Sequence, residues 1–277
     1  MRIHTPQFDL SLTLQAGQTF GWCSKEDRSW AGWIESHPVI LKQEGDTIFV
    51  SSEGCTSAGV RKYLGVDDDP YQLLKAYLDD PYLLRALNSS STLRCIQDDF
   101  WECTVNFICS SQKQIPQIRS INALLRERYG EIIQSGHPAR FPPFSVIARL
   151  EESSLRECRL GYRAKYLLKA ARMLDDGSLS QERLQTLSTD EATKLLQTLP
   201  GVGCKVAQCI LLYALRRWDA FPIDVWVFRM MKEFYFPRRR QPLSHQLLDR
   251  YSRRAFGEMR GLAQLHLFHY ARHHTAK

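Results

Sequence analysis

A lysine and an aspartate nineteen residues apart, Lys205 and Asp224, are the side chains in this sequence best placed for covalent chemistry. A lysine amine acts as a nucleophile only when it is neutral, and a free lysine is almost entirely protonated at neutral pH. Lys205 falls in the first turn of a predicted helix, where the helix dipole disfavours a cation and burial would disfavour it further. Taken alone, such a lysine is far more often a solvated charge or a phosphate contact. An aspartate at a helix start is, equally, a preferred N-cap worth about 1 kcal/mol.

The residues before Lys205 predict two helices joined by a tight turn. Ser188–Glu191 has the Ser-x-x-Glu spacing of a capping box, which marks the start of the first helix. Pro200 ends that helix, and Gly201 and Gly203 permit the turn. A glycine-rich turn that opens a helix presents backbone amides and the positive end of the dipole to an anion. We therefore expect the turn to bind phosphate.

The segment Leu199–Lys205, followed by Pro222–Val225, resembles the helix-hairpin-helix DNA glycosylase superfamily. The Lys205 and Asp224 pair resembles the bifunctional members, which excise a base and then cut the strand. The resemblance implies that Lys205 attacks C1′ of the damaged nucleotide and forms a Schiff base, after which β-elimination breaks the strand. It also implies that Asp224 stabilises the cationic, oxocarbenium-like transition state.

Residues from both ends of the chain narrow the resemblance from the superfamily to one of its families. Gln264 and Phe268 lie four apart, and thus on one face of a predicted helix, while Cys209 lies one turn after the lysine. Together with the early segment Gly17–Phe20, they resemble the 8-oxoguanine DNA glycosylase family. The resemblance implies that Cys209 and Phe268 sandwich a flipped base and that Gln264 binds its pairing edge. It implies that Gly17 offers a carbonyl to N7–H, a donor that guanine lacks. Taken alone, Cys209 and Phe268 would be core residues and Gln264 a surface residue.

The family resemblance extends to residues that contact the DNA around the lesion. It implies that Tyr162 is a wedge in the helix and that Arg163 lies at the orphaned cytosine. The chain departs from the eukaryotic pattern at Gln112–Gln114, where an asparagine run is usual, and at Gln117, which stands in place of an arginine. Trp226 likewise replaces a histidine. We therefore expect a looser opposite-base preference than a strict demand for cytosine. The predicted DNA contacts are Gln112, Tyr162, Arg163, Gly201, Gly203 and Trp226.

Composition excludes several classes of protein. The 277 residues are 44% hydrophobic and 24% charged, which is typical of globular proteins. No apolar run is as long as a membrane span, and the first residues lack the apolar core of a signal peptide. The eight cysteines contain no C-x-x-C pair, so we expect reduced thiols in an intracellular protein. No cysteine after Cys209 is present to ligate an iron–sulfur cluster, which separates the chain from the cluster-bearing branch of the superfamily.

Charge is distributed unevenly between the two parts of the chain. Residues 1–100 hold 9 basic and 14 acidic side chains, whereas residues 101–277 hold 28 basic and 16 acidic ones. The basic part also carries the predicted hairpin, so we expect it to lie on a polyanion. His269 and His273 lie four apart and could share a metal ion, but no third ligand lies nearby, so no metal site is expected.

The pattern of apolar residues predicts an α+β fold. Strict alternation over Phe8–Gln15 predicts a strand, and Gln18–Trp22 resumes an extended pattern. With further strands to Val50, we expect an antiparallel sheet over residues 1–52. Helices are predicted to start at Asp69 and Asp80, each an acidic cap before a proline. From residue 98 onward helices are predicted over 100–111, 115–129, 163–174, 189–199, 204–215, 224–234 and 262–272.

These elements and the resemblance define the expected organisation. A small N-terminal α+β domain over residues 1–90, with a TATA-binding-protein-like sheet by resemblance, precedes an all-helical domain over residues 91–277. The expected function is a bifunctional DNA glycosylase/AP lyase that excises 8-oxoguanine from duplex DNA. The alternatives are a monofunctional glycosylase for another damaged base and a non-catalytic DNA-binding module. We expect no required cofactor, a possible monovalent cation at the hairpin as in relatives, no membrane association and a monomer that works with DNA inside the cell.

Overall fold

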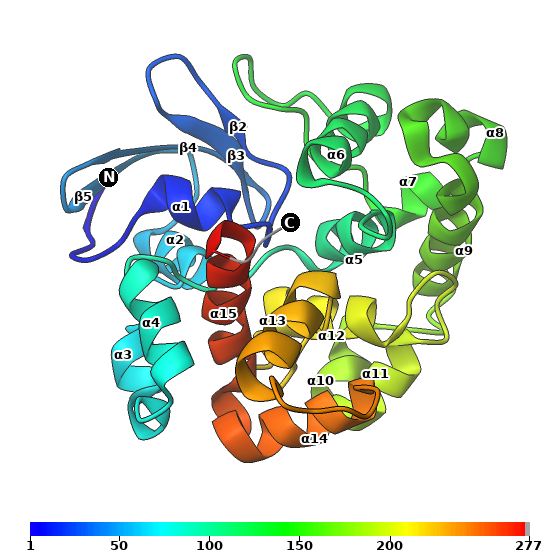
Figure 1. Ribbon diagram of the computed structural model, residues 1–277. Helices are drawn as coiled ribbons and strands as arrows, with labels where there is room; N and C mark the ends of the chain where they lie inside the picture. The colour runs from blue at the N-terminus through cyan, green and yellow to red at the C-terminus, as the bar shows by residue number, and fades with distance from the viewer. Residues whose placement is uncertain (275–277) are drawn as a thin grey trace.

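The buried apolar residues form two cores in the computed structural model, which describes residues 1–274 (Figure 1). The smaller core lies between an N-terminal sheet and the first helices. The larger core joins the helices that make up most of the chain. The fold is therefore α+β with an antiparallel sheet followed by a mostly helical region, as the sequence predicts.

Five antiparallel strands form the sheet in the order β1-β5-β4-β3-β2. Cross-strand neighbours place Trp30 opposite Leu41 and Leu41 opposite Val50, which aligns buried apolar side chains on one face. The indole of Trp33 donates to the carbonyl of Pro138 at 2.8 Å and so ties the sheet to the helical region. The strands are β1 (Arg2–His4), β2 (Cys23–Ser24), β3 (Trp30–Ile34), β4 (His37–Glu44) and β5 (Thr47–Ser51).

The prediction of a strand over Phe8–Gln15 is wrong, because this segment forms helix α1 (Leu10–Gln15). Asp9 is its N-cap and accepts a hydrogen bond from the Leu12 amide at 2.8 Å. Leu10 and Leu14 are buried one turn apart, so two of the alternating leucines also fit the helical period. The extended segment Gln18–Trp22 also lies outside the strands, so the sheet is smaller than predicted.

The helices between the sheet and residue 90 begin as their caps predict. Asp69 and Asp80 each accept a hydrogen bond from an amide two residues on, and each precedes a proline in the first turn. Helix α4 packs against α15 at the other end of the chain (Figure 1), and its apolar residues belong to the larger core. The predicted boundary near residue 90 stays a prediction. These helices are α2 (Ser57–Leu64), which was not predicted, α3 (Pro70–Leu73), η1 (Lys75–Tyr77) and α4 (Pro81–Ser89).

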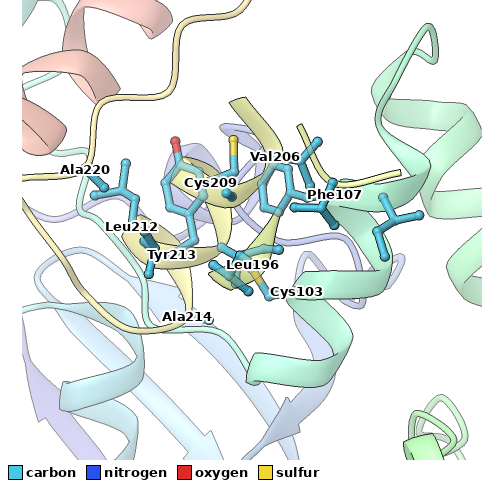
Figure 2. Packing of buried hydrophobic residues seen from close by; sticks show 14 of the residues in the cluster. Cys103, Phe107, Leu196, Val206, Cys209, Leu212, Tyr213, Ala214 and Ala220 are labelled. Atoms are coloured by element: carbon cyan, nitrogen blue, oxygen red, sulfur yellow. The ribbon is translucent and has the colours of Figure 1, made fainter. Parts of the chain in front are cut away.

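All seven helices predicted beyond residue 98 are present, with ends that differ by a few residues. Helix α12 lies at the centre and packs against α5 and α11, and Figure 2 shows the buried residues at this contact. The predicted helices are α5 (Phe100–Cys109), α6 (Ile115–Tyr129), α9 (Ala164–Asp175), α11 (Thr189–Leu196), α12 (Cys204–Tyr213), α13 (Val225–Tyr235) and α15 (Arg260–His274). The structure adds α7 (Phe144–Ala148), α8 (Glu152–Leu155), η2 (Arg156–Leu160), η3 (Gly161–Arg163), α10 (Gln181–Thr186), α14 (His245–Phe256) and η4 (Gly257–Met259).

Candidate active site

Lys205 and Asp224 line one cavity of about 450 Å³. Lys205 lies in the first turn of α12, and its Nζ donates a hydrogen bond to Ser110 Oγ at 3.1 Å. The same nitrogen lies 5.1 Å from the centre of the Phe107 ring. Asp224 is the N-cap of α13 and accepts a hydrogen bond from the Val227 amide at 2.8 Å. An amine and a carboxylate therefore face a common space from two helix starts.

Burial dominates the electrostatics of the cavity. It raises the pKa of Asp224, while the Val227 amide and the Lys205 charge act in the opposite direction. Burial also raises the pKa of the Cys209 thiol to about 11, although Lys205 opposes this shift. Cys209 is consequently a neutral thiol at physiological pH. It supplies a soft apolar wall rather than a second nucleophile.

The predicted base-pocket residues border the same cavity from three distant segments. Gln264 is buried and its Nε2 donates to the carbonyl of Pro222 at 3.1 Å, while its Oε1 has no partner among residues 1–274. A buried amide oxygen without a donor is costly, so this oxygen is free to accept a hydrogen bond. Cys209 lies on α12, as Figure 2 shows, and Phe268 lies one turn after Gln264 on α15.

Gly17 closes the cavity from the N-terminal region. Its φ of +87° favours glycine, and a Cβ at this position would lie 3.1 Å from Ile115 Cδ1. The backbone of Gly17 is thus exposed to the cavity without a side chain in front of it. The predicted site residues brought together here are Gly17, Lys205, Cys209, Asp224, Trp226, Gln264 and Phe268.

The hairpin before Lys205 has the geometry that its sequence predicts. Ser188 and Glu191 form both hydrogen bonds of the capping box, so that prediction is confirmed. Gly201 has φ +81°, and a Cβ there would lie 2.6 Å from Tyr166 Cδ2. Gly203 is the N-cap of α12 and has open space where a Cβ would be. The turn is thus fixed on one side by packing and open on the other.

The predicted DNA contacts Gln112, Tyr162 and Arg163 lie outside the cavity. Tyr162 is 46% exposed, and the Arg163 guanidinium lies 4.4 Å from the centre of its ring. Arg163 is itself buried and donates to the carbonyl of Ser111. Gln112 has φ +55° and lines an adjacent groove of about 860 Å³ that also borders Lys205. Trp226 lines both the cavity and this groove.

Among the cavity residues that were not predicted as site residues, three lie closest to the predicted chemistry. Ser110 accepts a hydrogen bond from the Lys205 amine, and the Phe107 ring faces the same amine. Arg272 lines the cavity from the last turn of α15. The sequence contained a signal for Arg272. It follows Gln264 and Phe268 at the spacing i, i+4, i+8, which puts all three on one helix face.

Residues 1–274 contain neither a cluster of metal ligands nor a membrane-spanning helix. No group of three or more histidine, cysteine, aspartate or glutamate side chains is arranged to hold a metal ion in that range. The His269 and His273 rings lie 4.7 Å apart on α15. None of the helices described is both long and apolar enough to span a membrane.

Comparison with known proteins agrees with this geometry. Residues 1–104 match the 8-oxoguanine DNA glycosylase N-terminal domain, and residues 105–252 match the HhH-GPD superfamily of base excision DNA repair proteins. The chain therefore belongs to the HhH-GPD superfamily and, within it, to the 8-oxoguanine DNA glycosylase family.

The relatives are similar over nearly their whole length. The chain is 29% identical to a "Probable N-glycosylase/DNA lyase" of Methanothermobacter thermautotrophicus, over 98% of this chain and 96% of that protein. It is 31% identical to a solved structure described as MBOgg1 in complex with a low affinity DNA ligand, with a TM-score of 0.89 and coverage of 98% and 94%. A Clostridium acetobutylicum 8-oxoguanine glycosylase/lyase bound to DNA with cytosine opposite 8-oxoG is 26% identical, with the same TM-score and coverage.

Proposed function

We propose that this protein excises 8-oxoguanine from duplex DNA and then cleaves the strand as an AP lyase. The observation that carries the proposal is a cavity that holds an amine, a carboxylate and an unpartnered amide oxygen. The amine and carboxylate suit attack at a sugar carbon. The amide oxygen and apolar walls suit a flat heterocycle that carries N–H donors. The family of the chain and the names of its relatives support the same activity.

The chemistry follows from the positions of these groups. The lone pair of a neutral Lys205 amine bonds Nζ to C1′ while the bond from C1′ to the base breaks, and the departing base takes that electron pair together with the proton that Nζ gives up. Asp224 stabilises the positive charge that develops on the sugar. The nitrogen lone pair then forms C1′=N as the C1′–O4′ bond breaks and O4′ takes a proton from water, which gives a protonated Schiff base. Loss of a proton from C2′ then expels the 3′ phosphate. Ser110 and Phe107 hold the amine at the cavity wall before DNA binds.

Base selection is assigned to the remaining cavity residues. Gln264 Oε1 accepts from the pairing edge, and Cys209 and Phe268 cover the two faces of the ring. Gly17 offers its carbonyl to N7–H, which 8-oxoguanine has and guanine lacks. The hairpin glycines hold the backbone, while Tyr162 and Arg163 lie at the opposite base, and Gln112 and Trp226 border the groove beside the lysine. We infer that the protein acts as a monomer on DNA inside the cell.

A borohydride trap tests the covalent step. The protein is incubated with duplexes that carry 8-oxoguanine opposite each of the four bases, and borohydride is added to reduce any Schiff base. We expect a covalent adduct with wild-type protein and with Lys194→Gln, a matched control on the exposed face of α11. Lys205→Gln should give none. Released base without an adduct would favour a monofunctional glycosylase, and neither product would favour a DNA-binding module.

A further inference from the structure

Arg272 is a charged side chain in the cavity that the mechanism above does not use. It lies in the last turn of α15 and is half-buried, with its guanidinium carbon 5.5 Å from the centre of the Phe268 ring. A Cβ placed on Gly17 would lie 3.9 Å from Arg272 Nη1. The guanidinium is therefore close to the backbone of Gly17 and to one of the predicted faces of the base pocket.

The guanidinium has no acceptor of its own. Among residues 1–274 it makes no hydrogen bond and no ion pair that would satisfy its five N–H donors. Burial lowers the pKa of Arg272, and the charge of Asp224 opposes this effect. Two further titratable neighbours do not serve as partners, because Arg119 is a like charge and His269 makes no hydrogen bond to Arg272 among residues 1–274. A half-buried donor without a partner is a group that a ligand can satisfy.

The chemistry of the lesion supplies such an acceptor beside Gly17. 8-Oxoguanine differs from guanine at two adjacent ring atoms, because N7 carries a hydrogen and C8 carries a carbonyl oxygen. If Gly17 accepts from N7–H, a donor next to Gly17 can reach one of the two oxygens that flank N7, at C6 or at C8, and only the C8 oxygen is absent from guanine. We propose that Arg272 donates a hydrogen bond to this oxygen and is a second specificity-determining residue. The inference rests on the proposed function, since it assumes 8-oxoguanine in this cavity.

The two contacts reject guanine for complementary reasons. Gly17 would present an acceptor to the bare N7 of guanine, and Arg272 would present a donor to a C8–H group that cannot accept. Unpaired polar groups in a closed site lower affinity strongly. Contacts at adjacent atoms thus read both features that oxidation adds to the base.

Single-turnover excision tests the assignment with three substrates. These are duplexes that carry 8-oxoguanine, 8-thioguanine or a preformed abasic site. 8-Thioguanine keeps N7–H but replaces the oxygen with sulfur, a weak acceptor. Two variants change Arg272: Arg272→Met keeps the apolar stem, and Arg272→Lys keeps the charge. The control is Arg183→Met, which removes one positive charge from an exposed position on α10.

For 8-oxoguanine we expect Arg272→Met to lose about 10- to 100-fold in excision rate, the range for a charged hydrogen bond, and Arg272→Lys to lose less. For 8-thioguanine the loss should be under about 3-fold, and cleavage of the abasic site should change by under about 2-fold. Undiminished excision of 8-oxoguanine by Arg272→Met would overturn the proposal. An equal loss on both lesions would overturn it too, because Arg272 would then act through Asp224 or through stacking.

A loss on the abasic site that matches the loss on 8-oxoguanine would mean that Arg272 contacts the DNA backbone, which also rejects the assignment. If the thermal midpoint shows that Arg272→Met does not fold, Arg272→Lys decides alone. A rate that is reduced on 8-oxoguanine but not on the other two substrates supports the contact, and any other pattern rejects it. Failure of wild-type protein to release 8-oxoguanine would instead refute the proposed substrate.

Discussion

Replacing Asp224 with asparagine should separate catalysis from folding at a single position. The Asp224 carboxylate caps α13 through a 2.8 Å hydrogen bond from Val227, and asparagine caps helices about as well as aspartate. Asp224→Asn should therefore keep the cap, whereas Asp224→Ala should lose about 1 kcal/mol of stability. The asparagine variant isolates the negative charge from the hydrogen bond that the same side chain makes.

The contribution of the Asp224 carboxyl group to the free energy of unfolding depends on pH. Burial raises the pKa of Asp224 above the ordinary aspartate value of 3.8. The contribution of this carboxyl group to stability is then greatest below pH 3.8 and is lost as the pH rises through the folded-state pKa. Asparagine does not titrate, so Asp224→Asn should match the wild type in acid and be at least as stable at neutral pH. Urea unfolding at several pH values measures this difference.

The effect on catalysis should be large. A charge that stabilises a developing cation in a buried site is worth about 3–4 kcal/mol, so single-turnover excision should slow by about 10²- to 10³-fold. Binding to a duplex with an uncleavable abasic analogue should stay within about 3-fold, because the carboxylate adds repulsion to phosphate rather than attraction. If Asp224→Asn loses stability as Asp224→Ala does, or if binding and turnover fall together, Asp224 is a cap and not a catalytic residue.

Three further predictions concern stability, each measured by urea unfolding. Gly201→Ala should cost about 2–4 kcal/mol of stability, because it places a Cβ against the Tyr166 ring at a residue with positive φ. Gly203→Ala should cost under about 0.5 kcal/mol, because the space beside Gly203 is open. Equal losses for the two variants would refute this explanation. His266 is buried and its pKa is lowered to about 3, so the wild type should lose up to about 1.4 kcal/mol per pH unit below 6.5, and His266→Gln should flatten that slope. Glu102→Gln should cost about 3–5 kcal/mol because it breaks a buried 2.7 Å ion pair with Arg126, and a cost under about 1 kcal/mol would show that the pair is not isolated from water.

Local signals predicted most of the fold and part of the site. Asp69, Asp80 and Ser188 cap helices where their spacing predicts, because capping depends on residues only two or three positions apart. The alternation of apolar and polar residues over Phe8–Gln15 gave a wrong prediction, because Leu10 and Leu14 fit both a strand and a helix pattern. The Asp9 cap favours the helix. Tertiary packing chose between the two.

The cavity itself could not be predicted from local signals. The turn and the spacing of Lys205 and Asp224 identified the chemistry, and the family resemblance supplied Gly17, Gln264 and Phe268. The nearness of Arg272 to Gly17 depends on how α15 packs against the N-terminal region, and no short-range pattern encodes that contact. Long-range packing thus decides which acceptors and donors meet around the base.

Helix α15 makes contacts on two of its faces. On one face α15 presents Gln264 and Phe268 to the cavity, and on the other His266 forms a 2.8 Å hydrogen bond with Ser90 beyond the end of α4. Gly17, from the N-terminal region, lines the same cavity next to Arg272 of this helix. Apart from Cys209 on α12, the residues proposed to contact the base come from the two ends of the chain, whereas Lys205 and Asp224 come from its middle. Lesion preference can therefore evolve through the first ninety residues and the last fifteen while the cutting chemistry stays untouched.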